Sequence, residues 1–324
     1  MLIRWRPAYS HPLLAILVWT CWWWWGGEAA WAALTRHTEI AITMVFGSFI
    51  AGATSEGGGA VAFPVFTKLL HIAPADAKVF SLAIQSVGMT AASVVIVAMR
   101  IPVEWWVIRW ASLAGVPGML VGVYLISPLL GPAAVKLSFT LLVGSFAVTL
   151  FALNRGIRDV NTQVPKRGGV ELGLVLLAGF LGGSMSGLVG NGIDIIVFSF
   201  MVLLFRVCEK IATPTSVMLM AINSLVGFFL HWGVLDRFTP EIQGWWLAAV
   251  PIVVVGAPLG AMLCARLKRT TIARLLLLLI AVEVLTTLWL VPIDGRSALI
   301  ASTVLLCFGG VYTWMYHSRH YEPA

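Results

Sequence analysis

Charged side chains are scarce in this sequence of 324 residues. Only 11% of the residues are Asp, Glu, Lys or Arg, 60% are hydrophobic, and the mean hydropathy is +0.94. A soluble globular chain carries about 25% charged residues, so this chain has too few to cover a soluble surface of its size. The scarcity excludes a soluble enzyme, a nucleic-acid-binding module and a disordered scaffold, and it predicts a polytopic membrane protein.

Metal, disulfide and nucleotide patterns are also lacking. The four cysteines, Cys21, Cys208, Cys264 and Cys307, are scattered, with no C-x-x-C pair and no histidine at zinc spacing. No phosphate-binding loop occurs, which argues against ATP as the direct energy source. We therefore expect no cofactor, no metal and no nucleic-acid partner.

Long apolar stretches dominate what is present. A membrane span needs roughly 20 apolar residues, and eight stretches qualify: 12–33, 79–99, 105–126, 133–153, 211–232, 244–264, 272–291 and 297–316. Two further stretches, 40–71 and 170–206, are interrupted by glycine-rich breaks. Each half of an interrupted stretch has about 12–18 residues, which is enough to reach the middle of the bilayer and turn back.

Basic residues indicate that both interrupted stretches turn back. The loops around 155–167 and 266–269 are strongly basic and are expected on the cytoplasmic side, which requires 170–206 to re-enter rather than cross. Carried along the chain, the same count places both termini and 15 of the 21 basic residues on the cytoplasmic side. We expect a multi-pass membrane protein, in contact with the lipid bilayer.

The first stretch has two interpretations. Arg4 and Arg6, an apolar core and the small residues between Ala29 and Ala33 resemble a cleavable signal peptide. The bulky run of four tryptophans at 22–25 instead favours a retained span with an interfacial aromatic anchor.

The two halves of the chain resemble each other. The matching features are Phe49 to Gly52 with Phe180 to Gly183, Gln85-Ser86 with Asn223-Ser224, Trp105-Trp106 with Trp245-Trp246, and Gly115-x-Pro117 with Gly256-x-Pro258. Each half is expected to hold one broken hairpin and three spans, and the halves begin on opposite sides of the membrane. Inverted repeats with discontinuous helices indicate a secondary transporter whose site lies at the midplane.

The predicted fold is therefore an all-α polytopic membrane protein with two inverted-topology repeats. Each repeat is a broken re-entrant hairpin plus three transmembrane helices, and one extra helix lies at each end of the chain. The predicted parts are the N-terminal helix or signal peptide (1–36), repeat 1 (37–155), a basic cytoplasmic linker (156–169), repeat 2 (170–293) and a C-terminal helix with its tail (294–324).

The two breaks are the main candidates for a substrate site. Non-helical backbone at membrane depth is tolerated only inside protein or beside water. Helices beginning near Ala60 and Ile193 would direct unpaired amide groups and positive dipole ends at the bilayer centre. No Lys or Arg lies in the middle of a predicted span, so we expect an anionic or strongly polar substrate bound by backbone groups. The alternative is that the glycines only permit tight helix packing.

The candidate substrate-binding residues belong to the breaks and to equivalent polar positions of the spans. They are Ser55, Gly57, Gly58, Gly59, Gln85, Ser86, Gly190, Asn191, Gly192, Asn223 and Ser224. The polar span residues could equally join helices by hydrogen bonds, and Thr54, Ser55, Ser184 and Ser186 could cap half-helices.

Glu56 is the candidate for proton coupling. A carboxylate at the bilayer centre is costly and usually functional, and an ionised Glu56 would repel a bound anion. We expect Glu56 to be protonated when anion is bound, so that the two move together; alternatively, it is paired within its loop or lies nearer the interface. Asp194 is a candidate cap of the second half-helix, and Glu283 is a third acidic candidate within a span.

These residues carry a family resemblance. Gly57, Gly58 and Gly59 followed by Pro64, an Ala/Ser/Gln-rich span from 77 to 86, and the repeated Gly-x-Pro spans make the chain similar to the sulfite exporter TauE/SafE family of anion permeases. The resemblance covers about 40–291. It implies ion-coupled secondary transport of sulfite and small organosulfur anions, such as sulfonates, in the inner (cell) membrane. We predict a small sulfur-containing anion such as sulfite, thiosulfate or an organosulfonate as the substrate and, because of Glu56, a proton rather than sodium as the coupling ion.

Two other functions are weighed against this one. The same architecture could transport another small solute, or a cation drawn by Glu56, Asp194 and Glu283. An intramembrane enzyme using Ser186 and His231 is not favoured, because the spacing around Ser186 is not that of a G-x-S-x-G turn, and we predict no enzyme. The sequence leaves open the direction of transport and whether the chain forms a homo-oligomer.

Overall fold

The computed structural model describes residues 10–57, 65–155, 159–292, 294–318 and 320–321. All regular secondary structure within these ranges is helical, and no β-strand is present. The eleven α-helices are α1 (Ser10–Arg36), α2 (Thr38–Ala53), α4 (Pro74–Ala98), α5 (Trp105–Val121), α6 (Pro132–Leu153), α7 (Gly169–Val189), α8 (Ile193–Ser199), α9 (Glu209–Phe229), α10 (Pro240–Arg266), α11 (Arg269–Leu290) and α12 (Gly295–His317). Short turns extend or join them: η2 (Val65–Leu69), η3 (Gly122–Ile126), η4 (Ser127–Leu129), η5 (Phe200–Leu204) and η6 (Leu230–Val234).

Eight of the described helices are long and apolar enough to cross a membrane, which confirms the all-α polytopic class. They are α4, α5 with η3 and η4, α6, α7, α9 with η6, α10, α11 and α12. The predicted number is the same, but the membership differs. The helix α1 is not among the eight; it is interrupted at Gly27, whose φ is 49°. The helix α7 is among them because it has 21 residues, where the sequence suggested a shorter half of a hairpin.

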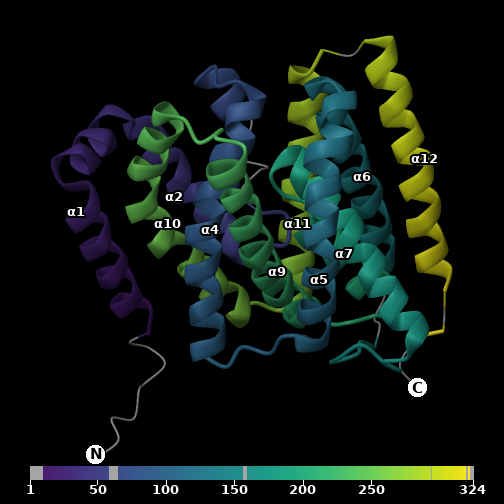
Figure 1. Cartoon of the computed structure of the whole chain (residues 1–324). Helices are drawn as coiled ribbons and strands as arrows, with labels where there is room; N and C mark the ends of the chain where they lie inside the picture. Colours follow the sequence, from purple (N-terminus) through teal and green to yellow (C-terminus); the bar gives the residue numbers. More distant parts are fainter. Residues whose placement is uncertain (1–9, 58–64, 156–158, 293, 319, 322–324) are drawn as a thin grey trace, which may run out of the picture.

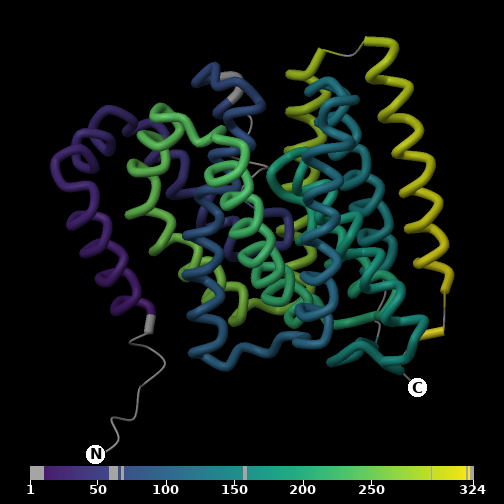
Figure 2. The backbone as a smooth tube through the Cα atoms, in the orientation of Figure 1, coloured from purple at the N-terminus to yellow at the C-terminus, as the bar shows by residue number. Residues whose placement is uncertain are grey.

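The helices stand side by side in one bundle, with α1 and α12 at opposite edges (Figures 1 and 2). The helix α1 packs on α10, and α12 packs on α6. In Figure 1, α4 and α6 begin at the upper end of the bundle, whereas α1 begins and α12 ends at the lower end. The loops that follow α4, α6 and α10, which are rich in arginine, also lie at the lower end.

The helix before the first break packs tightly against α10. A Cβ on Gly52 would overlap the carbonyl of Ala257, and a Cβ on Gly260 would overlap the carbonyl of Phe49. These glycines let the backbones of α2 and α10 approach more closely than any other residue would allow, as small residues do between membrane helices.

The helix before the second break makes the same kind of contact with α5. A Cβ on Gly183 would overlap the carbonyl of Gly115, and a Cβ on Gly118 would overlap the carbonyl of Phe180. The pairs α2–α10 and α5–α7 are the two most extensive contacts between helices in the described chain. In each pair, the helix before a break packs on the Gly-x-Pro helix of the other half.

The two ends of the second interrupted stretch lie together. Tyr321 donates to Glu171 Oε1 at 2.8 Å in the first turn of α7, and its ring packs 5.1 Å from that of Phe205, just after η5. Asn161, which precedes α7, donates from Nδ2 to the carbonyl groups of Phe205 and Tyr321 at 2.8 Å each. The start of α7 and the end of η5 therefore share one set of contacts.

The first interrupted stretch also begins and ends in one place. Ile40, in the first turn of α2, and Ile72, just after η2, belong to the same buried apolar cluster. Phe66 of η2 and Ile242 from the start of α10 complete this part of the cluster. Burial of these side chains holds both ends of the stretch beside the start of α10.

Candidate functional site

The first break lies inside the protein. The helix α2 ends at Ala53, and Glu56 and Gly57 follow as buried residues. Gly57 has φ 71°, a conformation that favours glycine, and a Cβ there would lie 3.3 Å from Asp194 Oδ2. Gly58, Gly59 and the helix expected near Ala60 lie outside the described residues.

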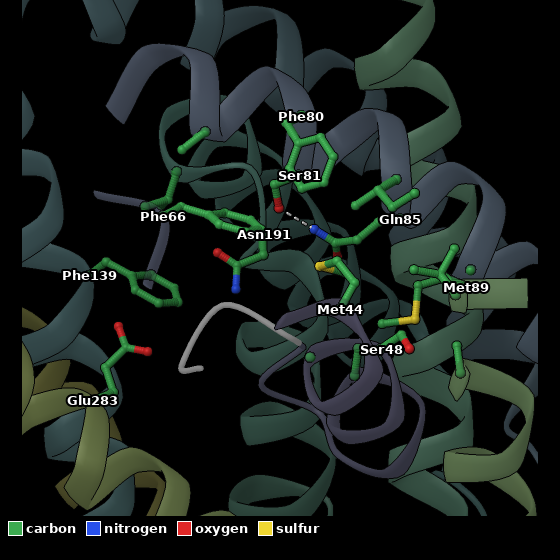
Figure 3. A pocket seen from close by; sticks show the side chains of 18 of the residues that line it. Met44, Ser48, Phe66, Phe80, Ser81, Gln85, Met89, Phe139, Asn191 and Glu283 are labelled. Carbon is green, nitrogen blue, oxygen red and sulfur yellow. Dashed lines mark hydrogen bonds between the residues drawn. The ribbon is translucent and has the colours of Figure 1, made fainter. Parts of the chain in front are cut away.

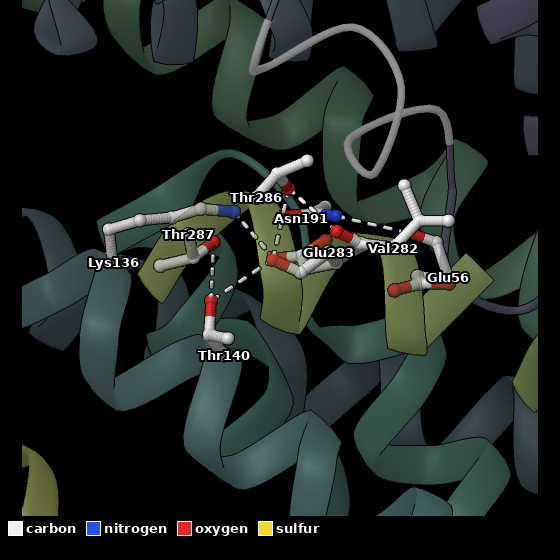
Figure 4. A network of polar contacts seen from close by, with 8 residues as sticks. All are labelled: Glu56, Lys136, Thr140, Asn191, Val282, Glu283, Thr286 and Thr287. Carbon is white, nitrogen blue, oxygen red and sulfur yellow. Dashed lines mark hydrogen bonds and ion pairs between the residues drawn. The ribbon is translucent and has the colours of Figure 1, made fainter. Parts of the chain in front are cut away.

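The second break touches the first directly. The helix α7 is followed by Gly190 with φ 92° and by Gly192 with φ 148°, and Asn191 lies between them. Its side chain donates from Nδ2 to the backbone carbonyl of Glu56 at 3.1 Å (Figure 4). The two breaks, 135 residues apart in sequence, are thus joined by a hydrogen bond.

The amide groups at the start of α8 are already satisfied by the protein itself. Asp194 Oδ1 accepts from the amides of Gly192 and Ile195 at 3.0 Å each, and Ser186 Oγ accepts from the amide of Ile193 at 3.0 Å. Asp194 and Ser186 are therefore the caps of α8, one of the roles considered for them. The expectation that bare amides at this helix start hold the substrate is wrong for these three groups, because they have partners.

A cavity of about 50 Å³ lies beside the joined breaks (Figure 3). Its walls come from α2, α4, α6, α10, α11 and the end of α7, and hence from both halves of the chain. The polar side chains in the wall are Ser48, Ser81, Gln85, Lys136, Asn191 and Glu283. One water needs roughly 10–15 Å³ of such space, so the cavity suits a small solute rather than a large one.

Two predicted binding side chains, Gln85 and Asn191, line this cavity. Gln85 donates from Nε2 to Ser81 Oγ at 2.6 Å and to the carbonyl of Gly190 at 3.2 Å. Its Oε1 is buried and has no partner among the described residues. Ser55 lies in the first break, and its buried hydroxyl likewise has no partner in the described chain.

The other predicted span residues do not line the cavity. The hydroxyls of Ser86 and Ser224 donate to carbonyl groups three residues earlier in their own helices. Asn223 is buried where α9 faces α5, and its Oδ1 lies 3.3 Å from the position of a Cβ on Gly115. The hydroxyls of Ser86 and Ser224 therefore bond within their own helices, and Asn223 Nδ2 has no hydrogen-bond partner in the described chain.

Two hydroxyl groups that flank the breaks bond within their own helices. Thr54 donates to the carbonyl of Ile50 at 3.0 Å, and Ser184 donates to that of Phe180 at 2.9 Å. Each bond runs to a carbonyl group four residues earlier in the chain, so neither bond caps the start of a half-helix.

The structure adds a cation that sequence reasoning missed. Lys136 Nζ lies 2.5 Å from Glu283 Oε1, and the two side chains are only 8% and 2% exposed. Thr140 donates to Glu283 Oε1 at 3.4 Å and to Thr287 Oγ1 at 3.1 Å (Figure 4). This lysine extends from the second turn of α6 into the cavity wall, so a charged side chain lies where the sequence suggested backbone groups alone. The signal available in the sequence was Glu283, since an acid inside a span requires a buried partner.

Glu56 lies beside this ion pair. Its side chain is fully buried, and its carboxyl group lies close enough to that of Glu283 for the two to interact electrostatically. Neither carboxylate oxygen of Glu56 has a hydrogen-bond partner in the described chain. Two buried carboxyl groups that lie close together cannot both ionise without a large penalty.

The serine and histidine considered for an enzyme are not joined. Ser186 accepts from the amide of Ile193, while His231 Nδ1 bonds the carbonyl of Gly227 in its own helix at 2.9 Å. His231 is also buried.

Comparison with known families decides the class of protein. Residues 40–287 match the family described as Sulfite exporter TauE/SafE, from α2 to the last turn of α11. The chain belongs to the sulfite exporter TauE/SafE family. Membership implies a membrane transporter of sulfite-type anions, and it confirms the resemblance that the glycine motifs suggested. The helices α1 and α12 lie outside the matched segment of this TauE/SafE protein. Searches of curated proteins and of solved structures gave no significant match.

Proposed function

We propose that this TauE/SafE protein is a secondary transporter that moves a small sulfur-containing anion across the inner membrane together with protons. Sulfite, thiosulfate and small organosulfonates are the proposed substrates. The observation that carries the proposal is the small buried cavity whose polar wall, including Gln85 and Lys136 from one half and Asn191 and Glu283 from the other, is shared between the two halves. A site between two repeats can open to either side as one repeat moves against the other.

We infer that 40–71 and 170–206 are re-entrant hairpins of two inverted repeats. The inference is supported by the contacts that bring together both ends of each stretch, at Tyr321 in one case and at Ile40 and Ile72 in the other. The two glycine-mediated helix pairs also correspond to each other: α2 packs on α10, and its counterpart in the other half, α7, packs on α5, the counterpart of α10. On this topology the loops after α4, α6 and α10 face the cytoplasm, as do both termini.

Lys136 is the proposed electrostatic partner of the anion, and Gln85 and Asn191 are its hydrogen-bonding neighbours. The ammonium group is held by Glu283 in the absence of substrate. A bound oxyanion would compete with Glu283 for this ammonium group, since both offer negatively charged oxygen acceptors. Binding would then weaken the ion pair between α6 and α11. Loss of this ion pair would let the two helices move apart when the cavity is occupied.

The charges around the cavity give a physical reason for coupling anion transport to protons. The cluster contains three acids, Glu56, Asp194 and Glu283, and one lysine, Lys136. With all four groups ionised, the cluster would repel an anion. Proton uptake by the Glu56–Glu283 pair removes that repulsion, so protonation and anion binding favour each other by reciprocal linkage. This makes Glu56 the proposed proton carrier and gives Glu283 a part that the sequence did not assign.

The test is uptake of ³⁵S-labelled sulfite, thiosulfate and a sulfonate into proteoliposomes that contain the purified protein and no ATP. We expect accumulation of at least one of these anions when a proton gradient is imposed and none when the gradient is collapsed. Uptake that ignores the proton gradient would overturn the coupling. Uptake of sodium or potassium in place of every sulfur anion would favour the cation alternative.

A further inference from the structure

A second cavity, of about 160 Å³, adjoins the first and lies where α4 and α6 begin. These helix starts are at the upper end of the bundle in Figure 1. It is walled by the starts of α4 and α6, by the turn before α6 and by the end of α7. The lining residues are Pro74, Ala75, Lys78, Ser127, Leu130, Pro132, Val135, Lys136, Leu188 and Val189. We propose that this cavity is a vestibule that binds small oxyanions on the side of the membrane opposite the basic loops. The proposal rests on the proposed anion transport and adds its route of access.

The charge of the vestibule has one sign. Among the described residues that line it, Lys78 and Lys136 alone are charged, and both lie in the second turn of a long helix. The first residues of these helices, Pro74 and Pro132, also line the cavity, so two positive helix ends open into it. Asp76, the acid in the first turn of α4, is not part of the wall.

Lys78 has the geometry of a ligand-binding residue. Its side chain is buried, and it donates to the carbonyl of Gly187 at 3.3 Å, the one acceptor that it has among the described residues. A lysine ammonium group has three donors, so two N–H groups remain for an anion. Arg237 is close enough to act on Lys78 electrostatically and adds to the positive potential.

The two cavities share part of their wall. Lys136 and Val189 line both, and the Lys136 side chain extends toward Glu283 on the inner side (Figure 4). An anion in the vestibule therefore meets Lys136 before it meets the acidic groups of the inner cavity. A cleft lined by charge of one sign concentrates counter-ions and raises their rate of arrival. Lys78 would capture the anion and Lys136 would pass it inward.

The test measures the potential in the vestibule rather than transport. The four native cysteines are replaced by serine, Ala75→Cys is introduced into the vestibule, and the protein is reconstituted in vesicles of zwitterionic lipid. Two membrane-impermeant thiosulfonate reagents, one carrying a sulfonate and one a trimethylammonium group, are added to the side opposite the basic loops. The ratio of their reaction rates is compared with that at Gly295→Cys, an exposed position at the start of α12.

We expect the anionic reagent to be favoured at Ala75→Cys by roughly tenfold or more relative to Gly295→Cys. Lys78→Gln should move the ratio toward the reference value, and Arg296→Gln, a matched loss of an exposed charge, should leave it unchanged. Dissolved sulfate or methanesulfonate should slow labelling at Ala75→Cys.

Several results would overturn the proposal. These are a ratio that is the same with and without Lys78, no labelling from the side opposite the basic loops when the same reagents label from the other side, or protection in matched vesicles containing anionic lipid but none by dissolved sulfate. The last result would assign the cavity to a lipid headgroup. Because no flux is measured, a normal ratio without sulfur-anion uptake would reject the proposed function alone, and normal uptake without the ratio would reject the vestibule alone.

Discussion

Lys136 of α6 and Glu283 of α11 form a buried ion pair, 2.5 Å from Nζ to Oε1, that joins these two helices. Removal of one partner leaves the other as an uncompensated buried charge. We predict that Lys136→Met lowers the free energy of unfolding by roughly 3–5 kcal/mol. The double variant Lys136→Met/Glu283→Leu should recover most of that loss while remaining inactive in anion uptake.

Thermal unfolding in detergent would measure both effects, with Lys210→Met as the control. Lys210 is exposed at the start of α9, so its replacement should change the midpoint little. A Lys136→Met protein as stable as the Lys210→Met protein would show that the pair contributes nothing.

Glu56→Gln should uncouple transport from protons. Glutamine has the shape of a protonated glutamate and cannot release a proton, so the anion should still bind while uptake loses its response to an imposed proton gradient. Glu39→Gln is the matched control, since Glu39 has an exposed side chain in the first turn of α2, the helix that precedes the break containing Glu56. Retention of the full proton dependence by Glu56→Gln would eliminate this residue as the carrier.

The glycine contact between α7 and α5 should tolerate no side chain. In Gly183→Ala the new methyl group would overlap the carbonyl of Gly115, and we predict a loss of about 1–3 kcal/mol from overpacking. Gly309→Ala in α12 meets nothing within 4 Å and should be neutral or stabilising by up to about 1 kcal/mol. Equal thermal midpoints for the two variants would contradict the close approach of the helices.

The stability of the fold should fall at alkaline pH because of Tyr321. Burial, together with its hydrogen bond to Glu171, raises the pKa of Tyr321 to about 12, against about 10 in an unfolded chain. The protonated phenol is therefore favoured by the folded state. Its contribution to stability should be complete below pH 10 and be lost as the pH rises to about 12. Chemical denaturation at several pH values should show this decline in the native chain and a smaller one in Tyr321→Phe.

The helical class, the positions of the breaks and the importance of the glycines are local properties, and the sequence predicts them. Hydropathy locates apolar stretches, and glycine next to polar residues marks where a helix must stop inside the protein. Gly190 and Gly192 take backbone conformations that require their lack of a side chain, and Asn191 between them reaches Glu56. The family could be recognised because its motifs are local as well.

The chemistry of the site depends on contacts between distant parts of the chain, which hydropathy does not encode. Lys136 lies near the start of its span, where a lysine is usually expected to extend to the interface, and only the packing of α6 on α11 directs it to Glu283. The amides of α8 looked available because Ser186 is seven residues away from Ile193 in the sequence. The sequence also predicts the first segment as an unbroken span, whereas its helix is interrupted at Gly27.

The central claim is that both interrupted stretches enter and leave the bilayer on one side and meet inside it. Single cysteines at Arg36 and Ala73 bracket the first stretch, and single cysteines at Lys166 and Lys210 bracket the second; all four positions are exposed. Labelling of intact and of inverted membrane vesicles with an impermeant maleimide, in a chain without native cysteines, tests the claim directly. We predict that Arg36→Cys and Ala73→Cys react only from the outer side, and Lys166→Cys and Lys210→Cys only from the cytoplasmic side. Reaction of the two members of either pair from opposite sides would contradict the account.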